Sequence, residues 1–249
     1  MRDTPLWRRL LAEFVGSAFL AAIVIGSGIA AQNLSPGNVG LQLLENAAAT
    51  AAGLFVILVM FGPVSGGHFN PVVSFVDARF GGISWRDAAA YLPAQTAGCI
   101  CGAIVANVMF SEAAVSISTK HRASGPHFLS EAVATVGLVF AIFALARTGR
   151  SRLAPAAVGA YIGAAYFFTS STSFANPAIT VGRMFSDTFA GIAPSSVPNF
   201  VSAQAVGGVL AVGLLWLLYP GVTRGQASDV VVPHHMNRAR VGAGATETP

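Results

Sequence analysis

The dipeptide Asn-Pro occurs in two similar settings, in SGGHFNPVVSF at residues 65–75 and in SFANPAITVGRMF at residues 173–185. Asn is a preferred N-cap residue and Pro is favoured at the first position of a helix, so each dipeptide predicts the start of a helix. A single copy would be an ordinary loop cap. Two copies in matched places within an apolar chain need a common explanation.

The composition of the chain is that of a membrane protein. Of the 249 residues, 54% are hydrophobic and 10% are charged, and the mean hydropathy is +0.65. Soluble domains average about 25% charged residues, so this chain has too few charges to cover a surface that faces water. Apolar runs long enough to cross a hydrocarbon core of about 30 Å predict six spans, at about 9–31, 43–62, 86–110, 128–147, 153–172 and 198–219.

The two halves of the chain, at about 8–110 and 128–220, resemble each other. AEFVGSAFL, with Glu13, opens one half, and SEAVATVGLVF, with Glu131, opens the other. PAQTAGCICGAIVA and SAQAVGGVLAVGLL, later in each half, share the pattern Ala-Gln-x-x-Gly. Because each half holds three spans, the second half enters the membrane from the opposite side, which defines an inverted repeat.

The two Asn-Pro segments are predicted to be half-helices that meet inside the membrane. From Asn70 to about Phe80, and from Asn176 to about Asp187, each rises about 16 Å, half of the hydrocarbon core. The inversion brings them in from opposite faces with their N-termini together at the midplane. Irregular backbone at that depth persists only where it lines a water-filled cavity or is buried in protein, so the pattern predicts a pore.

The capping chemistry predicts what this pore passes. Each Asn oxygen is expected to accept a backbone N–H group of its own helix, which leaves its NH₂ group as a donor into the lumen. A water molecule there turns its oxygen to both donors, so a chain of waters cannot relay protons, and the two helix N-termini repel cations. Small neutral solutes are expected to pass.

SGGHFNPVV, FANPA, the two Glu residues and the two Ala-Gln pairs resemble the aquaporin, or major intrinsic protein, family, from about Arg8 to Tyr219. The resemblance implies an all-α membrane fold of six helices plus two re-entrant half-helices, one pore per subunit and usually a homotetramer. It implies that Glu13 and Glu131 order the re-entrant loops, although Glu13 has the alternative of simple proximity to the cytoplasmic interface. Val72 stands where Ala is usual. The implied pore motifs are Asn70, Pro71 and Val72, and Asn176, Pro177 and Ala178.

The family's second constriction, its selectivity filter, usually holds an Arg directly after the second Asn-Pro-Ala. Ile179 is in that place, and counting without gaps gives Thr50, Ala164 and Ser173 as the other three positions, with Gly163 or Ala165 as alternatives to Ala164. None of these four side chains is aromatic or cationic. The prediction is a wider, uncharged opening that admits solutes larger than water. The alternative is that neighbouring bulky side chains, such as Tyr166, Phe167 or Phe168, fill the space.

A filter with an aliphatic residue in place of Arg resembles that of a bacterial subgroup of aquaporins encoded beside arsenic-resistance genes. The resemblance implies metalloid acids such as arsenite and methylarsenicals as solutes, besides water, glycerol and urea. Arg183, one turn beyond Ile179, either bends into the vestibule, or points outward or pairs with Asp187. His68 is expected to face the other vestibule, as a fixed pore-lining or loop-ordering residue or as a pH gate.

The distribution of cations predicts the orientation. If the N-terminus is cytoplasmic, only Lys120, Arg122 and Arg183 among the 14 Lys and Arg residues lie outside, so both ends are expected in the cytoplasm. The chain is thus predicted to lie in the cell inner membrane, with residues 1–220 as one channel domain and residues 221–249 as a disordered cytoplasmic tail. Membrane lipid and small neutral solutes are the expected partners, and nucleic acid is not expected.

Other classes of function make different demands on the sequence. Cys99 and Cys101 point apart on one helix and offer neither a disulfide nor a metal site, so no metal and no cofactor are expected. An enzyme is not expected, because His68 has no evident Cys, Asp or second His partner in its layer. An ion-coupled secondary transporter would need charged groups near the midplane, where no Asp, Lys or Arg is expected. A structural membrane protein with a closed pore is the remaining alternative.

Overall fold

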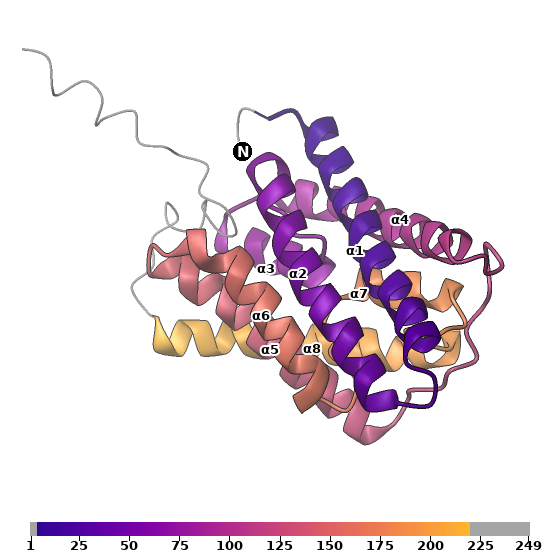
Figure 1. The fold of residues 1–249 in the computed structure, drawn as a ribbon. Coiled ribbons are helices and arrows are strands. Elements are labelled where there is room, and N and C mark those ends of the chain that lie inside the picture. Colours follow the sequence, from indigo (N-terminus) through magenta and orange to yellow (C-terminus); the bar gives the residue numbers. More distant parts are fainter. Residues whose placement is uncertain (1–3, 220–249) are drawn as a thin grey trace, which may run out of the picture.

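The computed structural model describes residues 4–219, and every regular element in this range is helical (Figure 1). The predicted tail at 221–249 lies outside the described residues. The α-helices are α1 (Leu6–Leu34), α2 (Val39–Ser65), α3 (Pro71–Phe80), α4 (Trp85–Met109), α5 (Gly125–Arg147), α6 (Ala154–Phe168), α7 (Pro177–Gly182) and α8 (Val197–Leu218). The short 3-10 helices are η1 (Ser151–Leu153), η2 (Arg183–Phe185) and η3 (Pro194–Ser196).

The long helices match the predicted spans, with one difference in length. Within residues 4–219, five helical segments are long and apolar enough to cross a membrane, namely α1, α2, α4, α5 and η3 with α8. The span predicted at 153–172 is α6, which has only 15 residues and is preceded by η1. It rises about 22 Å, less than the core of about 30 Å. The helix ends early because Thr169 has an extended backbone, with ψ of 137°.

Both Asn-Pro dipeptides start helices, as their chemistry predicts. Asn70 and Asn176 are extended N-cap residues, and Pro71 and Pro177 are the first residues of α3 and α7. The helix α3 has 10 residues and ends at a left-handed Gly81, with φ of 86°. The second half-helix, predicted to reach about Asp187, is shorter: α7 has 6 residues and continues as η2.

The helices pack in two sets with the same internal pattern. The helix α1 packs against α4 and α2, and α5 packs against α8 and α6, while α2 and α6 join the two sets (Figure 1). The half-helices α3 and α7, one from each set, contact each other. Equivalent helices therefore occupy equivalent places in the two halves, as an inverted repeat requires.

Glycine allows the closest of these contacts. A Cβ atom at Gly102 of α4 would collide with the carbonyl oxygen of Ala18 on α1, and one at Gly98 would collide with that of Phe14. Small residues let helix backbones approach in lipid, where burial of apolar surface between helices contributes little. The α1–α4 contact is therefore a contact between backbones.

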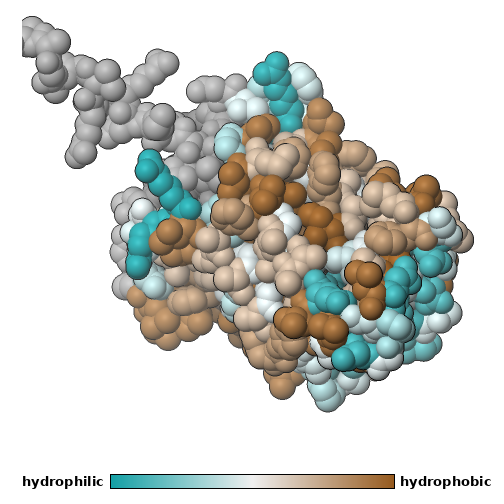
Figure 2. All heavy atoms as spheres, in the orientation of Figure 1, coloured by the Kyte–Doolittle hydropathy of each residue, from teal (hydrophilic) through white to brown (hydrophobic). Residues whose placement is uncertain are grey.

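The outer surface of the helices is apolar. Large hydrophobic side chains such as Leu129, Val209 and Leu217 are exposed. Apolar residues cover much of the face shown in Figure 2, with hydrophilic residues in separate groups. An apolar surface of this extent fits a lipid environment, because soluble monomers rarely expose large apolar patches.

Candidate functional site

The tips of the two half-helices are capped by their own Asn side chains. The Oδ1 atom of Asn70 accepts the backbone N–H of Val72 at 3.0 Å, and the Oδ1 atom of Asn176 accepts that of Ala178 at 2.9 Å. Both Asn side chains are buried, and both line the same cavity. The oxygen of each amide is thus used within its own helix.

The NH₂ group of each Asn bonds to the opposite loop. The Nδ2 atom of Asn70 donates to the carbonyl of Ala175, and that of Asn176 donates to the carbonyl of Phe69, both at 2.7 Å. Phe69 and Ala175 have positive φ angles of 48° and 47°, which turn these carbonyls toward the crossing amides. Since an amide NH₂ group has two donors, each Asn keeps one N–H group for the lumen.

A carboxylate holds the second loop in this strained shape. One oxygen of Glu131 accepts the Ser171 hydroxyl at 2.6 Å and the Phe174 N–H at 2.9 Å. The other accepts the Ala175 N–H at 2.8 Å and the Gln204 amide at 2.6 Å. Glu131 is fully buried, so its charge is balanced by these four donors.

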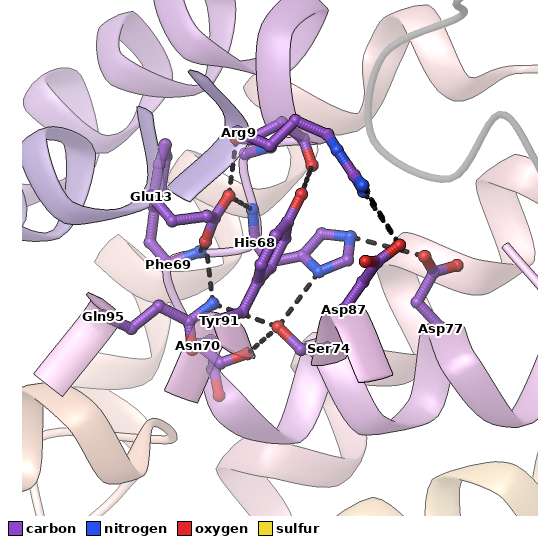
Figure 3. Close-up of polar contacts among 12 residues, drawn as sticks. Arg9, Glu13, His68, Phe69, Asn70, Ser74, Asp77, Asp87, Tyr91 and Gln95 are labelled. Atoms are coloured by element: carbon purple, nitrogen blue, oxygen red, sulfur yellow. Dashed lines mark hydrogen bonds and ion pairs between the residues drawn. The ribbon is translucent and has the colours of Figure 1, made fainter. Parts of the chain in front are cut away.

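Glu13 does the same for the first loop (Figure 3). Its Oε1 atom accepts the Ser65 hydroxyl at 2.6 Å and the His68 N–H at 3.0 Å. Its Oε2 atom accepts the Phe69 N–H and the Gln95 amide, both at 2.7 Å. The two carboxylates thus have matching sets of partners, and Glu13 is buried among them instead of lying at the interface.

In each half, one further hydroxyl group connects the Gln partner of the carboxylate to the N-cap of the half-helix. Gln95 also donates to the Ser74 hydroxyl at 3.0 Å, and Ser74 donates to the carbonyl of the capping Asn70 at 3.1 Å. In the other half, Gln204 donates to the Thr180 hydroxyl at 2.9 Å, and Thr180 donates to the carbonyl of the capping Asn176 at 2.7 Å. Sequence reasoning missed Ser74 and Thr180, although each stands four residues after its Asn, one helical turn away.

One cavity of about 60 Å³ runs past the Asn pair. Toward the α3 side it is lined by Leu58, Gly67, His68, Leu138 and Ile142. Toward the α7 side it is lined by Thr50, Tyr166, Ser173, Phe174, Ile179 and Arg183. The cavity therefore has lining on both sides of the midplane pair, which is the arrangement of a pore.

Three of the four predicted filter residues lie on the α7-side wall, and Ala164 does not. Thr50, Ser173 and Ile179 are buried and line the cavity, whereas Ala164 is exposed. Tyr166 takes its place, with its hydroxyl 3.2 Å from Thr50 Oγ1. The assignment of Ala164 is wrong because the count assumed a loop of fixed length, and two residues turn a helix by about 200°. The wall therefore carries the aromatic ring of Tyr166, one of the bulky side chains that the alternative prediction places in this space.

Arg183 bends into the cavity instead of reaching outward. The side chain is 2% exposed, and its guanidinium lies over the ring of Phe174 at 3.3 Å. Its Nε–H group donates to the carbonyl of Ala190. Asp187, the partner considered as an alternative for Arg183, instead accepts the backbone N–H of Thr119 at 2.8 Å. Arg183 thus supplies a positive charge one turn beyond Ile179.

His68 has an acidic neighbour, contrary to prediction. Its Nε2 atom lies 3.5 Å from Oδ2 of Asp77, and its Nδ1 atom lies 3.0 Å from the Ser74 hydroxyl (Figure 3). Asp77 is 1% exposed and does not itself line the cavity, but it lies directly behind His68, which does. The signal was its spacing: Asp77 follows Asn70 by seven residues, two helical turns, and so shares a face of α3 with the residues beside the pore.

Val72 and the cysteines occupy ordinary packing positions. A Cβ atom at Gly208 of α8 would lie 2.7 Å from Cγ1 of Val72, so the larger side chain at this motif position fills space that a glycine leaves. Cys99 is buried and Cys101 is exposed, so they point apart. Among residues 4–219 no group of three or more His, Cys, Asp or Glu side chains is placed to hold a metal ion.

Comparison with known proteins assigns this architecture to a family. The Major intrinsic protein family matches residues 1–175. Aquaglyceroporin AqpS of Rhizobium meliloti (strain 1021) is 47% identical over 221 residues, which cover 88% of this chain and 94% of that protein. Aquaporin NIP1-4 of Oryza sativa subsp. japonica is 32% identical over 179 residues, 70% of this chain and 64% of that one.

A solved structure has the same fold. The X-ray structure of the aquaglyceroporin from Plasmodium falciparum aligns with a TM-score of 0.64 at 17% identity, over 85% of this chain and 96% of that one. The chain belongs to the major intrinsic protein family, as its Asn-Pro motifs predict. It is an integral membrane protein that forms a channel for water and small solutes.

Proposed function

We propose that this chain is a passive channel for uncharged polar solutes larger than water, with glycerol, urea and metalloid acids such as arsenite and methylarsenicals as candidate solutes. The observation that carries the proposal is Ile179, which is buried on the cavity wall at the position where family resemblance implies an Arg. Aquaglyceroporin AqpS, which is 47% identical, supports the same class of solute.

The chemistry of the α7-side wall supports solutes that are polar on one side and apolar on the other. Thr50, Tyr166 and Ser173 contribute hydroxyl groups, and the Ser173 hydroxyl has no hydrogen-bond partner within residues 4–219. Ile179 contributes an apolar surface to the same wall. A wall of this kind replaces the hydration of a polyol or a neutral oxyacid without a fixed charge at the narrow point.

The Asn pair supports exclusion of cations and protons. Each Asn keeps one N–H donor for the lumen, and a water or hydroxyl oxygen accepts from both. The donors face the same point as the N-termini of the half-helices, so the midplane is unfavourable for positive charge. Flux is then expected to follow the solute gradient alone.

The same proposal includes the assembly and placement that resemblance and charge distribution favour. The chain is proposed to lie in the cell inner membrane as a homotetramer, with both termini in the cytoplasm. Residues 1–220 form the channel domain and residues 221–249 the tail. Protease protection of the ends in oriented membrane vesicles, and the mass of the detergent-purified particle, test these two points.

Stopped-flow permeability of proteoliposomes tests the function itself. We expect the wild type to pass glycerol and urea faster than empty vesicles, and Ile179→Arg to slow these solutes more than water. Ile179→Leu, which conserves volume and charge, is the matched control and should keep the wild-type ratio of glycerol to water permeability. An unchanged ratio in Ile179→Arg would contradict the filter assignment, and arsenite uptake no faster than in empty vesicles would remove the metalloid acids.

The buried His68–Asp77 pair suits a second candidate, an ion-coupled transporter. Ionisable pairs at membrane depth commonly belong to proton relays, and this pair lies beside the cavity. A coupled transporter would show a rate that saturates with solute and accelerates when a pH gradient is imposed. A rate that rises linearly with the solute gradient and does not respond to the pH gradient supports the channel.

A further inference from the structure

Three cations converge on one short stretch of backbone at the end of the cavity where α7 ends, which we call the α7-side mouth. Lys120 donates to the carbonyl of Phe189 at 2.9 Å. Arg122 donates to the same carbonyl at 3.3 Å and to that of Gly191 at 2.9 Å. Arg183 donates to the carbonyl of the residue between them. The stretch 189–191 thus gathers three positive charges at this mouth, and Arg183 is the one that lines the cavity.

Among residues 4–219, no carboxylate forms an ion pair with any of these three cations. Within residues 4–219 the ion pairs are Arg9–Asp87 and His68–Asp77, neither of which lies at this mouth. Asp187 is close enough to attract the charge of Lys120, and its oxygens accept hydrogen bonds from the Ser118 and Thr119 side chains and the Thr119 N–H. Glu131, which also attracts the two arginines, already accepts hydrogen bonds from four donors, three in the second loop and one from Gln204 of α8. Carbonyl acceptors hold the cations in place without cancelling their charge.

The charges are close enough to affect one another. Lys120 lies in the loop between α4 and α5, outside the membrane-spanning segments, and partial burial lowers the pKa of its ammonium group to about 8, with Arg122 and Arg183 adding to the effect. Neighbouring like charges disfavour a further positive charge. For the same reason, an anion placed among the three side chains is stabilised by all of them.

The Arg183 side chain has donors available for such an anion. It is buried, it lines the cavity, and it uses only its Nε–H group within the protein. The terminal N–H groups of its guanidinium have no acceptor among the described residues. A guanidinium with free terminal donors binds two oxygens of one anion in a planar, bidentate manner.

We propose that the α7-side mouth is a binding site for small oxyanions, with Arg183 as the bidentate donor and with Arg122 and Lys120 supplying further charge. The class of ligand is an anion with two or more terminal oxygens, such as a carboxylate, a sulfate or the conjugate base of an oxyacid. The site lies beyond Ile179, so it is separate from the filter and does not depend on which neutral solute the filter passes. A bound anion that does not permeate closes the pore to neutral solutes from this side.

Sulfate is a suitable probe, because its charge is constant near neutral pH. Binding is measured by titration calorimetry on the purified full chain in a non-ionic detergent, with sulfate added against chloride at constant ionic strength. We expect saturable sulfate binding that weakens at least tenfold in Arg183→Gln and several-fold in Lys120→Gln. Arg183→Lys, which keeps the charge but not the paired donors, should lie between the wild type and Arg183→Gln.

Arg79→Gln is the matched control. Arg79 is an exposed Arg near the end of α3, where it packs over the ring of Trp216 at 4.7 Å, so its removal should leave sulfate affinity unchanged. Lys120 lies in a loop and is only partly buried, so its variant keeps the test valid if Arg183→Gln fails to fold. Absence of saturable sulfate binding, or equal affinity in the wild type and Lys120→Gln, would overturn the proposal.

A flux measurement links the site to the pore. Sulfate added outside proteoliposomes should slow glycerol uptake through the wild type and leave uptake through Arg183→Gln unaffected. Equal inhibition of the two proteins would overturn the location of the site. Water flux provides the same comparison if glycerol does not pass, so a failure of the proposed solute class stays distinct from a failure of this site.

Discussion

Replacing Glu131 by Gln has a cost that follows from its contacts. All four hydrogen bonds to Glu131 come from donors, and three of these are N–H groups that cannot accept. A Gln side chain has one oxygen, so one pair of donors must face an NH₂ group. The less costly orientation turns this group to Ser171, whose hydroxyl can reverse and accept. The N–H group of Phe174 is then left without an acceptor.

The magnitude follows from these changes. A buried donor without an acceptor costs about 1–3 kcal/mol, and the two bonds to the remaining oxygen lose their charge assistance, at about 1 kcal/mol each. We expect the free energy of unfolding to fall by about 3–5 kcal/mol. Glycerol conductance should fall as well, since the same loop carries Ser173 and the second Asn cap.

The assay is reversible unfolding of the purified chain in mixed micelles of a mild detergent and SDS, followed by far-UV circular dichroism. Glu45→Gln is the matched control, because Glu45 makes one side-chain hydrogen bond, from Ser35 at 2.8 Å. Its variant should unfold within about 0.5 kcal/mol of the wild type. If Glu131→Gln also stays within about 1 kcal/mol, the four donors do not hold the loop and the reasoning fails.

Two further predictions concern packing and pH. Gly102→Ala should lower the free energy of unfolding by about 2–3 kcal/mol in the same assay, because its methyl group meets the α1 backbone, whereas Gly213→Ala, which meets open space, should be neutral or stabilising. A large effect of Gly213→Ala would show that the difference does not come from the α1 contact. Sulfate affinity should fall several-fold between pH 7 and 9, because Lys120, which faces Arg122, Arg183 and Asp187, has a pKa of about 8 and loses its charge above it. Calorimetry on Lys120→Gln should give a flat profile, and the same fall in this variant would assign the titration to another group.

The parts of the fold that depend on local chemistry were predictable from the sequence. An Asn followed by Pro caps a helix wherever it stands, so the starts of α3 and α7 were predicted correctly. Glu13 and Glu131 stood out because carboxylates at membrane depth need a reason. Their backbone partners did not, since a backbone N–H group has no signature in the sequence.

The errors arose where position depends on packing. Gly182 approaches the backbone of Cys99 closely, and the chain leaves the α-helix there, so the second half-helix is shorter than its apolar run indicates. The filter position of this span, predicted at Ala164 with Gly163 or Ala165 as alternatives, depended on loop length, which nothing local determines, and Tyr166 lines the cavity instead. Asp77 was missed because its position beside His68 depends on how the first re-entrant loop packs against α3, where the structure keeps the carboxyl group buried.

The crossed amides of Asn70 and Asn176 have a consequence for biosynthesis. Each donates to a carbonyl that belongs to the other half, so neither re-entrant loop completes its bonding alone. The N-terminal half is synthesised first. The carbonyl of Phe69, a residue with a left-handed backbone, has no Asn176 donor until the second half has been made. Maturation of the conduit is therefore a late event that joins both halves in one step, and a chain cut between them retains helices without a finished passage.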